Sequence, residues 1–152
     1  MANTFSQLYV QIVFSVKSRD KAIPPAHRDE IHKYITVLVA DEGQKLMAIF
    51  CMPDHIHILV SFNPEMPIAQ LVRKIKTESS KFINGKSWMA SKFQWQSGYG
   101  VFSYSKSQVR NVVNYILKQE EHHQSKSFHT EYRQFMEKFE IDYDERYLFD
   151  LE

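Results

Sequence analysis

Two histidines separated by a single residue, His55 and His57, lie in an otherwise apolar stretch of this 152-residue chain. Side chains alternate between the two faces of a β-strand, so both imidazoles would point the same way while Ile56 and Ile58 point into the core. Two imidazoles side by side can bind one metal ion. A half-buried strand whose polar face happens to carry two histidines has the same pattern, so the motif leaves both interpretations open.

A tyrosine and a glutamine four residues apart, Tyr115 and Gln119, form a second candidate group. On a helix their side chains would be separated by about 40°, at the edge of an apolar stripe made up of Val109, Val112, Val113 and Ile116. A phenol can act as a covalent nucleophile when a metal ion or a base lowers the cost of ionising it. The carbonyl oxygen of Gln119 could be a third metal ligand. A tyrosine in such a position more commonly packs its ring and exposes its hydroxyl.

Two further histidines, His122 and His123, follow Gln119 by about one helical turn, so His123 could face the same metal ion. We expect instead that both are solvated at a helix end, where the helix dipole favours an imidazolium cation. They are therefore left out of the predicted site.

The elements that would position these residues alternate along the chain. Strands are predicted from β-branched and aromatic composition over residues 5–16, 45–51, 55–62 and 93–104, the last bent by Gly98 and Gly100. Helices are predicted from apolar residues at helical spacing over 27–41, 68–83, 105–123 and 128–139. This order predicts an α+β fold of the ferredoxin-like, split βαβ type. Its antiparallel sheet would carry helices on one face, and a C-terminal helix would carry Tyr115.

The composition favours one globular domain over residues 1–152, because 43% of the residues are hydrophobic and 14% are aromatic. No apolar run approaches the roughly 20 residues of a membrane span, and the N-terminus lacks the pattern of a signal peptide. The single cysteine, Cys51, cannot form an internal disulfide. These features predict a cytoplasmic location.

The formal net charge of +1 conceals an uneven distribution. The middle of the chain has six basic residues against Glu78 alone: Arg73, Lys74, Lys76, Lys81, Lys86 and Lys92. Between Glu137 and Glu152 there are seven acidic residues against two basic ones. Local positive potential is what binds phosphates, so the basic middle keeps nucleic acid among the possible partners. A solvated helix face would have the same composition.

Four segments, taken together, resemble the single-tyrosine HUH transposases of the insertion-sequence 200 type, which are named for a His-hydrophobic-His motif. The first three segments read MPDHIHILV (52–60), FQWQSGYGVFS (93–103) and YILKQ (115–119). The fourth contains Glu121-His122-His123, then Phe128, Glu131-Tyr132 and Phe135. Each segment is weak alone, but their order and spacing cover nearly the whole chain, so their combination is specific.

The resemblance implies an enzyme that cleaves and rejoins single-stranded DNA beside hairpins at the ends of a mobile element. Tyr115 would attack the scissile phosphate, leaving a 5′-phosphotyrosine link and a free 3′-hydroxyl. His55, His57 and Gln119 would hold the metal ion. Paired imidazoles alone suggest zinc or another transition metal, whereas the resemblance implies Mg²⁺ or Mn²⁺, which the oxygen ligand from Gln119 makes reasonable.

The resemblance also implies partners. The basic helix would contact hairpin DNA, and Arg73, Lys74 and Lys76 are the predicted contacts. Members of this family act as homodimers, commonly with the tyrosine helix of one subunit completing the site of the other. The sequence is compatible with a homodimer but does not require one.

Other interpretations remain open. The chain could be an inactive or host-retained descendant that still binds hairpins. It could also be a binding module like the RNA-recognition domains, which stack bases on exposed aromatic side chains of the central strands without a metal ion. A metal-dependent hydrolase of small molecules would instead have a closed pocket and form no covalent tyrosine adduct.

Overall fold

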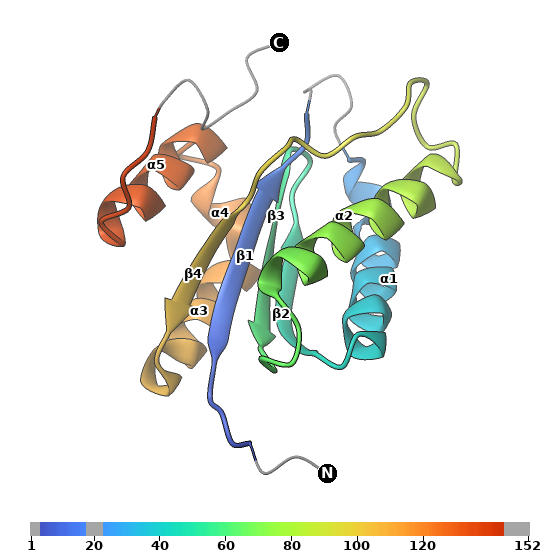
Figure 1. The fold of residues 1–152 in the computed structure, drawn as a ribbon. Helices are drawn as coiled ribbons and strands as arrows, with labels where there is room; N and C mark the ends of the chain where they lie inside the picture. Colours follow the sequence, from blue (N-terminus) through green and yellow to red (C-terminus); the bar gives the residue numbers. More distant parts are fainter. Residues whose placement is uncertain (1–3, 18–22, 145–152) are drawn as a thin grey trace.

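The computed structural model describes residues 4–17 and 23–144 of the chain, and its centre is a four-stranded antiparallel sheet (Figure 1). The strands are β1 (Tyr9–Ser15), β2 (Lys45–Cys51), β3 (His55–Ser61) and β4 (Gly100–Tyr104), in the order β2-β3-β1-β4. All three neighbouring pairs are antiparallel. The predicted α+β class with an antiparallel sheet is therefore confirmed.

Five α-helices accompany the sheet in the described part of the chain: α1 (Arg28–Asp41), α2 (Ile68–Asn84), α3 (Val109–Leu117), α4 (Gln119–His122) and α5 (Phe128–Lys138). Short 3-10 turns, η2 (Pro25–His27) and η3 (Lys106–Gln108), precede α1 and α3. Helix α1 connects β1 to β2 across β3, and α2 connects β3 to β4 across β1. Within the described residues, no helix is long and apolar enough to cross a membrane.

Both faces of the sheet carry helices, so the prediction of helices on one face was incomplete. Alternate residues of β1 and β3, such as Ile12 and Ile58, pack against α1 and α2 in the larger core. The opposite face carries Val13 and Leu59, which pack against α5 and α3 respectively. Figure 1 shows α1 and α2 on one side of the sheet and the three C-terminal helices on the other. All residues of β3 except Ser61 are buried, as expected of a strand that is covered on both faces.

The predicted strand over 93–104 is shorter in the structure, where β4 begins only at Gly100. Gly98 has a φ of +84°, which takes the backbone out of the extended conformation. Upstream of it, Trp95 makes a single antiparallel bridge to Val16 and donates its indole N–H to Ser79 Oγ at 2.9 Å. The segment before Gly98 is thus held by α2 and by backbone hydrogen bonds to the end of β1, without forming a regular strand.

The predicted helix over 105–123 is interrupted at Lys118, whose φ and ψ of −105° and 26° separate α3 from α4. Its start agrees with the sequence, since Ser105 and Gln108 form a capping box around the first turn. The interruption falls between Tyr115 and Gln119. It changes the direction of the chain so that Gln119, which is fully buried, meets polar partners on the sheet.

The acidic C-terminal segment predicted from the sequence falls partly outside the described residues, since the description ends at Asp144.

Candidate active site

The two motif histidines lie on the sheet face that α3, α4 and α5 cover. Antiparallel pairing places His57 opposite Val13 and His55 opposite Ser15 of β1. Both imidazoles are fully buried, with 0% of their surface exposed. Because an RNA-recognition-like module needs an open sheet face with exposed aromatic side chains, this covered face argues against that interpretation.

Helix α3 brings the predicted nucleophile to these histidines. Its apolar stripe packs on β2 and β3, where Val112 and Ile116 contact Ala48 and Leu59. This packing places Tyr115 next to the histidines. The centroid of the Tyr115 ring lies 6.1 Å from that of the His57 ring. The structure therefore brings Tyr115, His55, His57 and Gln119 together within one chain, as the predicted site requires.

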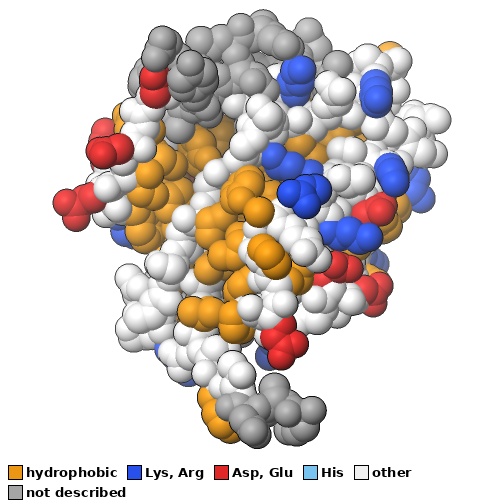
Figure 2. Space-filling view, viewed as in Figure 1, with side chains coloured by type: hydrophobic (Ala, Val, Ile, Leu, Met, Phe, Trp, Pro, Cys, Tyr) orange, Lys and Arg blue, Asp and Glu red, His pale blue; other side chains and the backbone are white. Residues whose placement is uncertain are grey.

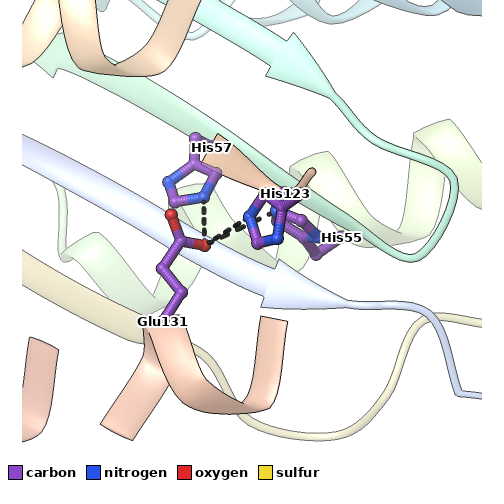
Figure 3. A group of neighbouring side chains, drawn as sticks. All are labelled: His55, His57, His123 and Glu131. Atoms are coloured by element: carbon purple, nitrogen blue, oxygen red, sulfur yellow. Dashed lines mark hydrogen bonds and ion pairs between the residues drawn. The ribbon is translucent and has the colours of Figure 1, made fainter. Parts of the chain in front are cut away.

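Helix α5 contributes a carboxylate that the sequence prediction did not include. Ser127 caps the helix by accepting a hydrogen bond from the Thr130 backbone N–H, and an apolar face packs it onto the sheet. On that same face Glu131 is only 1% exposed. Figure 3 shows its carboxylate pointing at the three imidazoles, with Oε1 lying 3.1 Å from Nε2 of both His57 and His123. The other oxygen, Oε2, accepts a hydrogen bond from the Tyr115 hydroxyl.

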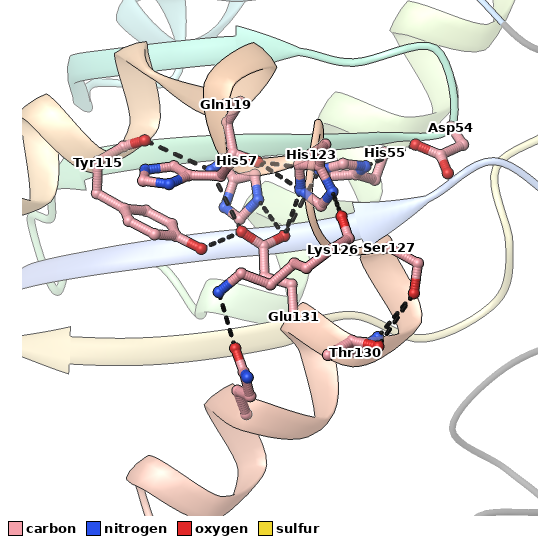
Figure 4. A network of polar contacts seen from close by, with 12 residues as sticks. Asp54, His55, His57, Tyr115, Gln119, His123, Lys126, Ser127, Thr130 and Glu131 are labelled. Atoms are coloured by element: carbon pink, nitrogen blue, oxygen red, sulfur yellow. Dashed lines mark hydrogen bonds and ion pairs between the residues drawn. The ribbon is translucent and has the colours of Figure 1, made fainter.

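His123 belongs to this group, so the expectation that it is solvated was wrong. Its side chain is 9% exposed, and its Nε2 lies 3.0 Å from Gln119 Oε1. The same glutamine oxygen lies 3.1 Å from His55 Nε2. The kink at Lys118 and the short α4 turn His123 back toward the sheet, whereas His122 stacks on the ring of Tyr115 at 4.4 Å. Figure 4 shows the resulting row of side chains.

Each of the three histidines is oriented by an oxygen at its Nδ1. Those oxygens belong to Asp54 for His55 (2.7 Å), Gln11 for His57 (2.6 Å) and the Lys126 backbone carbonyl for His123 (2.8 Å). An oxygen acceptor favours the tautomer with the proton on Nδ1, which leaves the Nε2 lone pair available. All three Nε2 atoms then face the oxygens of Glu131 and Gln119. A cation is the group that such a set of lone pairs attracts.

The chain matches a known protein family. The family described as "Transposase IS200 like" matches residues 4–119, more than half of the chain. The chain belongs to the IS200-like transposase family. Members of this family cut and join DNA, and the protein is therefore a transposase.

Individual relatives of the transposase are distant. The ISDra2 transposase TnpA of Deinococcus radiodurans is 23% identical over 120 residues, which cover 74% of this chain and 84% of the relative. Among solved structures, a proposed transposase from Deinococcus radiodurans has a TM-score of 0.62 at 20% identity, covering 78% of this chain and 95% of the other. A REP-associated tyrosine transposase bound to a REP hairpin has a TM-score of 0.61 at 13% identity, covering 81% and 73%. At these identities the two structures support the fold alone.

The electrostatics of the transposase site favour a metal ion. Burial lowers the pKa of His57 to about 4, against the opposing effect of Glu131, so this imidazole is neutral near pH 7. Burial raises the pKa of Glu131, but its polar contacts with His123, His57 and Tyr115 outweigh burial and hold that pKa far below its usual range. A neutral imidazole and an ionised carboxylate are the protonation states that bind metal ions. The ligand atoms of His55, His57, His123 and Glu131 all lie within 4.8 Å of one another.

Tyr115 is protonated in this arrangement. Burial and then the charge of Glu131 raise its pKa above the ordinary value of 10. A cavity of about 390 Å³ opens on Tyr115 and Glu131, and Lys126 and Lys138 are among its lining residues. Tyr115 therefore borders an open cavity that also carries two positive charges, which suit a phosphate.

The sequence prediction missed Glu131, His123, Asp54 and Gln11. One feature of the sequence could have indicated Glu131. It occupies the same helical face as Phe128 and Phe135, where a charged residue needs a buried partner. Gln11 has a similar feature, as a polar residue inside an apolar strand. Neither feature identifies the partner.

The predicted DNA contacts lie on α2, on the other side of the sheet. Arg73 and Lys74 are exposed. Lys76 instead donates hydrogen bonds to the carbonyl oxygens of Gln96 and Gly98, which fixes the segment before β4. The structure does not bring these three side chains to the metal-binding group.

The metal-free transposase is expected to lose stability as the pH falls from about 6.5 to about 4. Burial, followed by the charge of Arg28, lowers the pKa of His32 to about 4. Burial also lowers the pKa of His57 to about 4. The unfolded chain therefore binds protons that the folded chain does not, and folding weakens in that interval. Protonation of His32 would also break the 2.9 Å hydrogen bond that its Nε2 accepts from the Cys51 N–H. His123, whose pKa is raised by Glu131 against the effect of burial, acts in the opposite direction.

Urea unfolding at several pH values would measure this loss. The variant His32→Gln keeps an acceptor for the Cys51 N–H but does not titrate, so its stability should fall less steeply. Equal pH dependence in both proteins would contradict the assignment to His32.

Proposed function

We propose that this transposase cleaves and rejoins single-stranded DNA in a metal-dependent reaction, with Tyr115 as the nucleophile. The observation that carries the proposal is the buried network in which the carboxylate of Glu131 meets the Tyr115 hydroxyl, His57 and His123, and lies 3.6 Å from His55 Nε2. A tyrosine that only packs its ring would not need a link to a metal-binding group. Here the hydrogen bond to Glu131 holds the Tyr115 oxygen beside the residues that would bind the metal ion.

The proposed ligands are Nε2 of His55, His57 and His123 with the oxygens of Glu131 and Gln119. This set extends the two histidines and the glutamine predicted from the sequence. When bound, a divalent ion would neutralise charge that develops on the phosphate oxygens. Three nitrogen ligands suit Mn²⁺ better than Mg²⁺, which prefers oxygen ligands and retained water. We therefore expect Mn²⁺ to support the reaction at lower concentration than Mg²⁺.

The proposed reaction exchanges one phosphodiester for another. The Tyr115 oxygen forms a bond to the phosphorus as the bond to the 3′ oxygen breaks, which leaves a 5′-phosphotyrosine and, once the departing oxygen takes up a proton, a 3′-hydroxyl. The phenolic proton passes to the neighbouring oxygens, for which Glu131 is the nearest acceptor in this structure. Attack of a 3′-hydroxyl on the phosphotyrosine reverses the step and rejoins DNA. No external energy source is needed, because the number of phosphodiester bonds is conserved.

The proposed substrate is a single strand that carries a hairpin. One structural relative is bound to a REP hairpin, and α2 presents the exposed basic side chains Arg73 and Lys74. We expect the substitutions Arg73→Ala and Lys74→Ala to weaken hairpin binding and to reduce its salt dependence. Each should reduce the slope of log K against log salt by about one unit.

The variant Lys76→Ala should behave differently, because Lys76 holds the segment before β4. It should lower the thermal stability of the protein as well as DNA binding. Fluorescence anisotropy with labelled hairpins at several salt concentrations would measure binding. An unchanged salt slope in the Arg73 and Lys74 variants would place the hairpin elsewhere.

A homodimer is also proposed from the family resemblance. The structure assembles Tyr115 with the histidines of its own chain, so one subunit contains every proposed catalytic residue. A dimer is therefore compatible with this site without being needed to complete it.

Incubation with single-stranded DNA from the flanks of the gene tests the proposal. With Mn²⁺, a strand labelled on the 3′ side of the cleavage point should appear as a covalent protein–DNA band on a denaturing gel. A 5′ label should instead mark a shorter free strand. Hairpin binding without any adduct would favour the second candidate, an inactive or host-retained descendant.

A further inference from the structure

A second cavity, of about 350 Å³, lies between the segment before β4, β4 itself and α5. We propose that it binds one unpaired base of the single strand, on the nucleotide whose 3′ oxygen leaves. This inference rests on the proposed function and concerns how the strand is positioned. The residues that matter for the argument are Ser15, Gln96, Tyr99, Phe128 and Tyr132, all of which line the cavity.

The cavity has walls that the fold holds in place. The Gln96 backbone N–H donates to the Ser15 carbonyl at 2.8 Å, and the Ser15 hydroxyl donates to Gln96 Oε1 at 2.6 Å. The Lys76 ammonium group donates hydrogen bonds to the carbonyl oxygens of Gln96 and Gly98. On the opposite wall, Tyr132 packs so closely on Gly100 that a Cβ there would lie 2.8 Å from its ring. The cavity is thus a structured site between fixed side chains.

Its position is adjacent to the metal-binding group. Phe128 stacks on the ring of His55 with centroids 4.3 Å apart, and Ser15 pairs with His55 across the sheet. Figure 4 shows Tyr115 at one end of the row of site residues and His55 at the other. In phosphoryl transfer the attacking and leaving oxygens lie roughly in line. The 3′ oxygen would therefore leave toward the His55 end, where the cavity lies.

The lining has the chemistry of a base-binding site. Tyr99, which is 40% exposed, provides aromatic surface on which a base can stack, and the buried rings of Phe128 and Tyr132 form an apolar wall beside it. Ser15 Oγ and Gln96 Oε1, which are hydrogen-bonded to each other, can each also accept a hydrogen bond from a base edge. Figure 2 shows hydrophobic side chains gathered on this face over β4 and α5, beside Lys and Arg side chains over α2. A single strand needs this combination of stacking surface and positive charge.

Fluorescence of 2-aminopurine tests binding without chemistry. The probe is placed at successive positions of a single strand, and the Tyr115→Phe protein is used so that the strand stays intact. We expect strong quenching at one position, immediately on the 5′ side of the cleavage point. The quenching should persist with an added Tyr99→Phe substitution and be lost with Tyr99→Ala. Phe5→Ala, which removes an aromatic ring that is 94% exposed before β1, is the matched control.

Adduct formation by the protein with Tyr115 intact gives the second readout. An abasic sugar at the same position should reduce the adduct yield by about 5- to 100-fold, and Tyr99→Ala should remove most of that difference. If adducts form equally well on abasic DNA and no position shows quenching, the base site is overturned but the proposed function is not. Quenching at one position without an adduct on any strand would instead overturn the proposed chemistry and leave the base site as a binding site.

Discussion

The variant Tyr115→Phe is expected to form no covalent DNA adduct, which corresponds to a loss of about a thousandfold or more. The substitution removes only the phenolic oxygen, which is the atom that would bond to phosphorus. The ring contacts of Tyr115 with His122 and Phe135 remain available to phenylalanine. Binding of hairpin DNA should therefore change little, and a denaturing gel beside a binding titration would separate the two effects.

Tyr104→Phe is the matched control, because Tyr104 lines the same cavity as Tyr115. Its hydroxyl accepts a hydrogen bond from Gln11 Nε2 at 2.7 Å, and losing that bond should cost about 1 kcal/mol of stability. Adduct formation should survive. If the adduct instead persisted in Tyr115→Phe and vanished in Tyr104→Phe, the nucleophile would be Tyr104.

The variant Glu131→Gln is expected to weaken Mn²⁺ binding by at least about 100-fold. It keeps the size and shape of the side chain but replaces one accepting oxygen by an NH2 group and removes the negative charge beside the three imidazoles. Isothermal titration with Mn²⁺ would measure the affinity directly. Thermal unfolding gives a second readout, because an ion that binds only the folded state raises the melting temperature of the wild type. That rise should nearly vanish in the variant.

Glu137→Gln provides the control for this change, since Glu137 lies on the same helix but is exposed. It should leave both metal affinity and adduct formation unaltered. Unchanged Mn²⁺ affinity in Glu131→Gln would remove this carboxylate from the ligand set. The metal site would then consist of the histidines and Gln119 alone.

Local patterns in the sequence determined which face of its strand or helix each predicted site residue occupies. The alternation around His55 and His57 predicts a strand with both imidazoles on one face, and that strand is β3. The spacing of Val112 and Ile116 predicts the buried stripe of α3, and with it the side of the helix on which Tyr115 lies. These predictions succeed because the period of a strand or a helix fixes which face a side chain occupies.

The composition of the site was decided by the tertiary structure. Glu131 reaches His57 across 74 residues of sequence, and Gln11 reaches it across 46. His123 joins the group after the interruption at Lys118, in a stretch of polar residues whose spacing does not show which of them are buried. Periodicity gives the face of each element but not which faces meet. Which faces meet depends on how β1, β3 and α5 pack against one another. Only this packing places the carboxylate of Glu131 among three imidazoles.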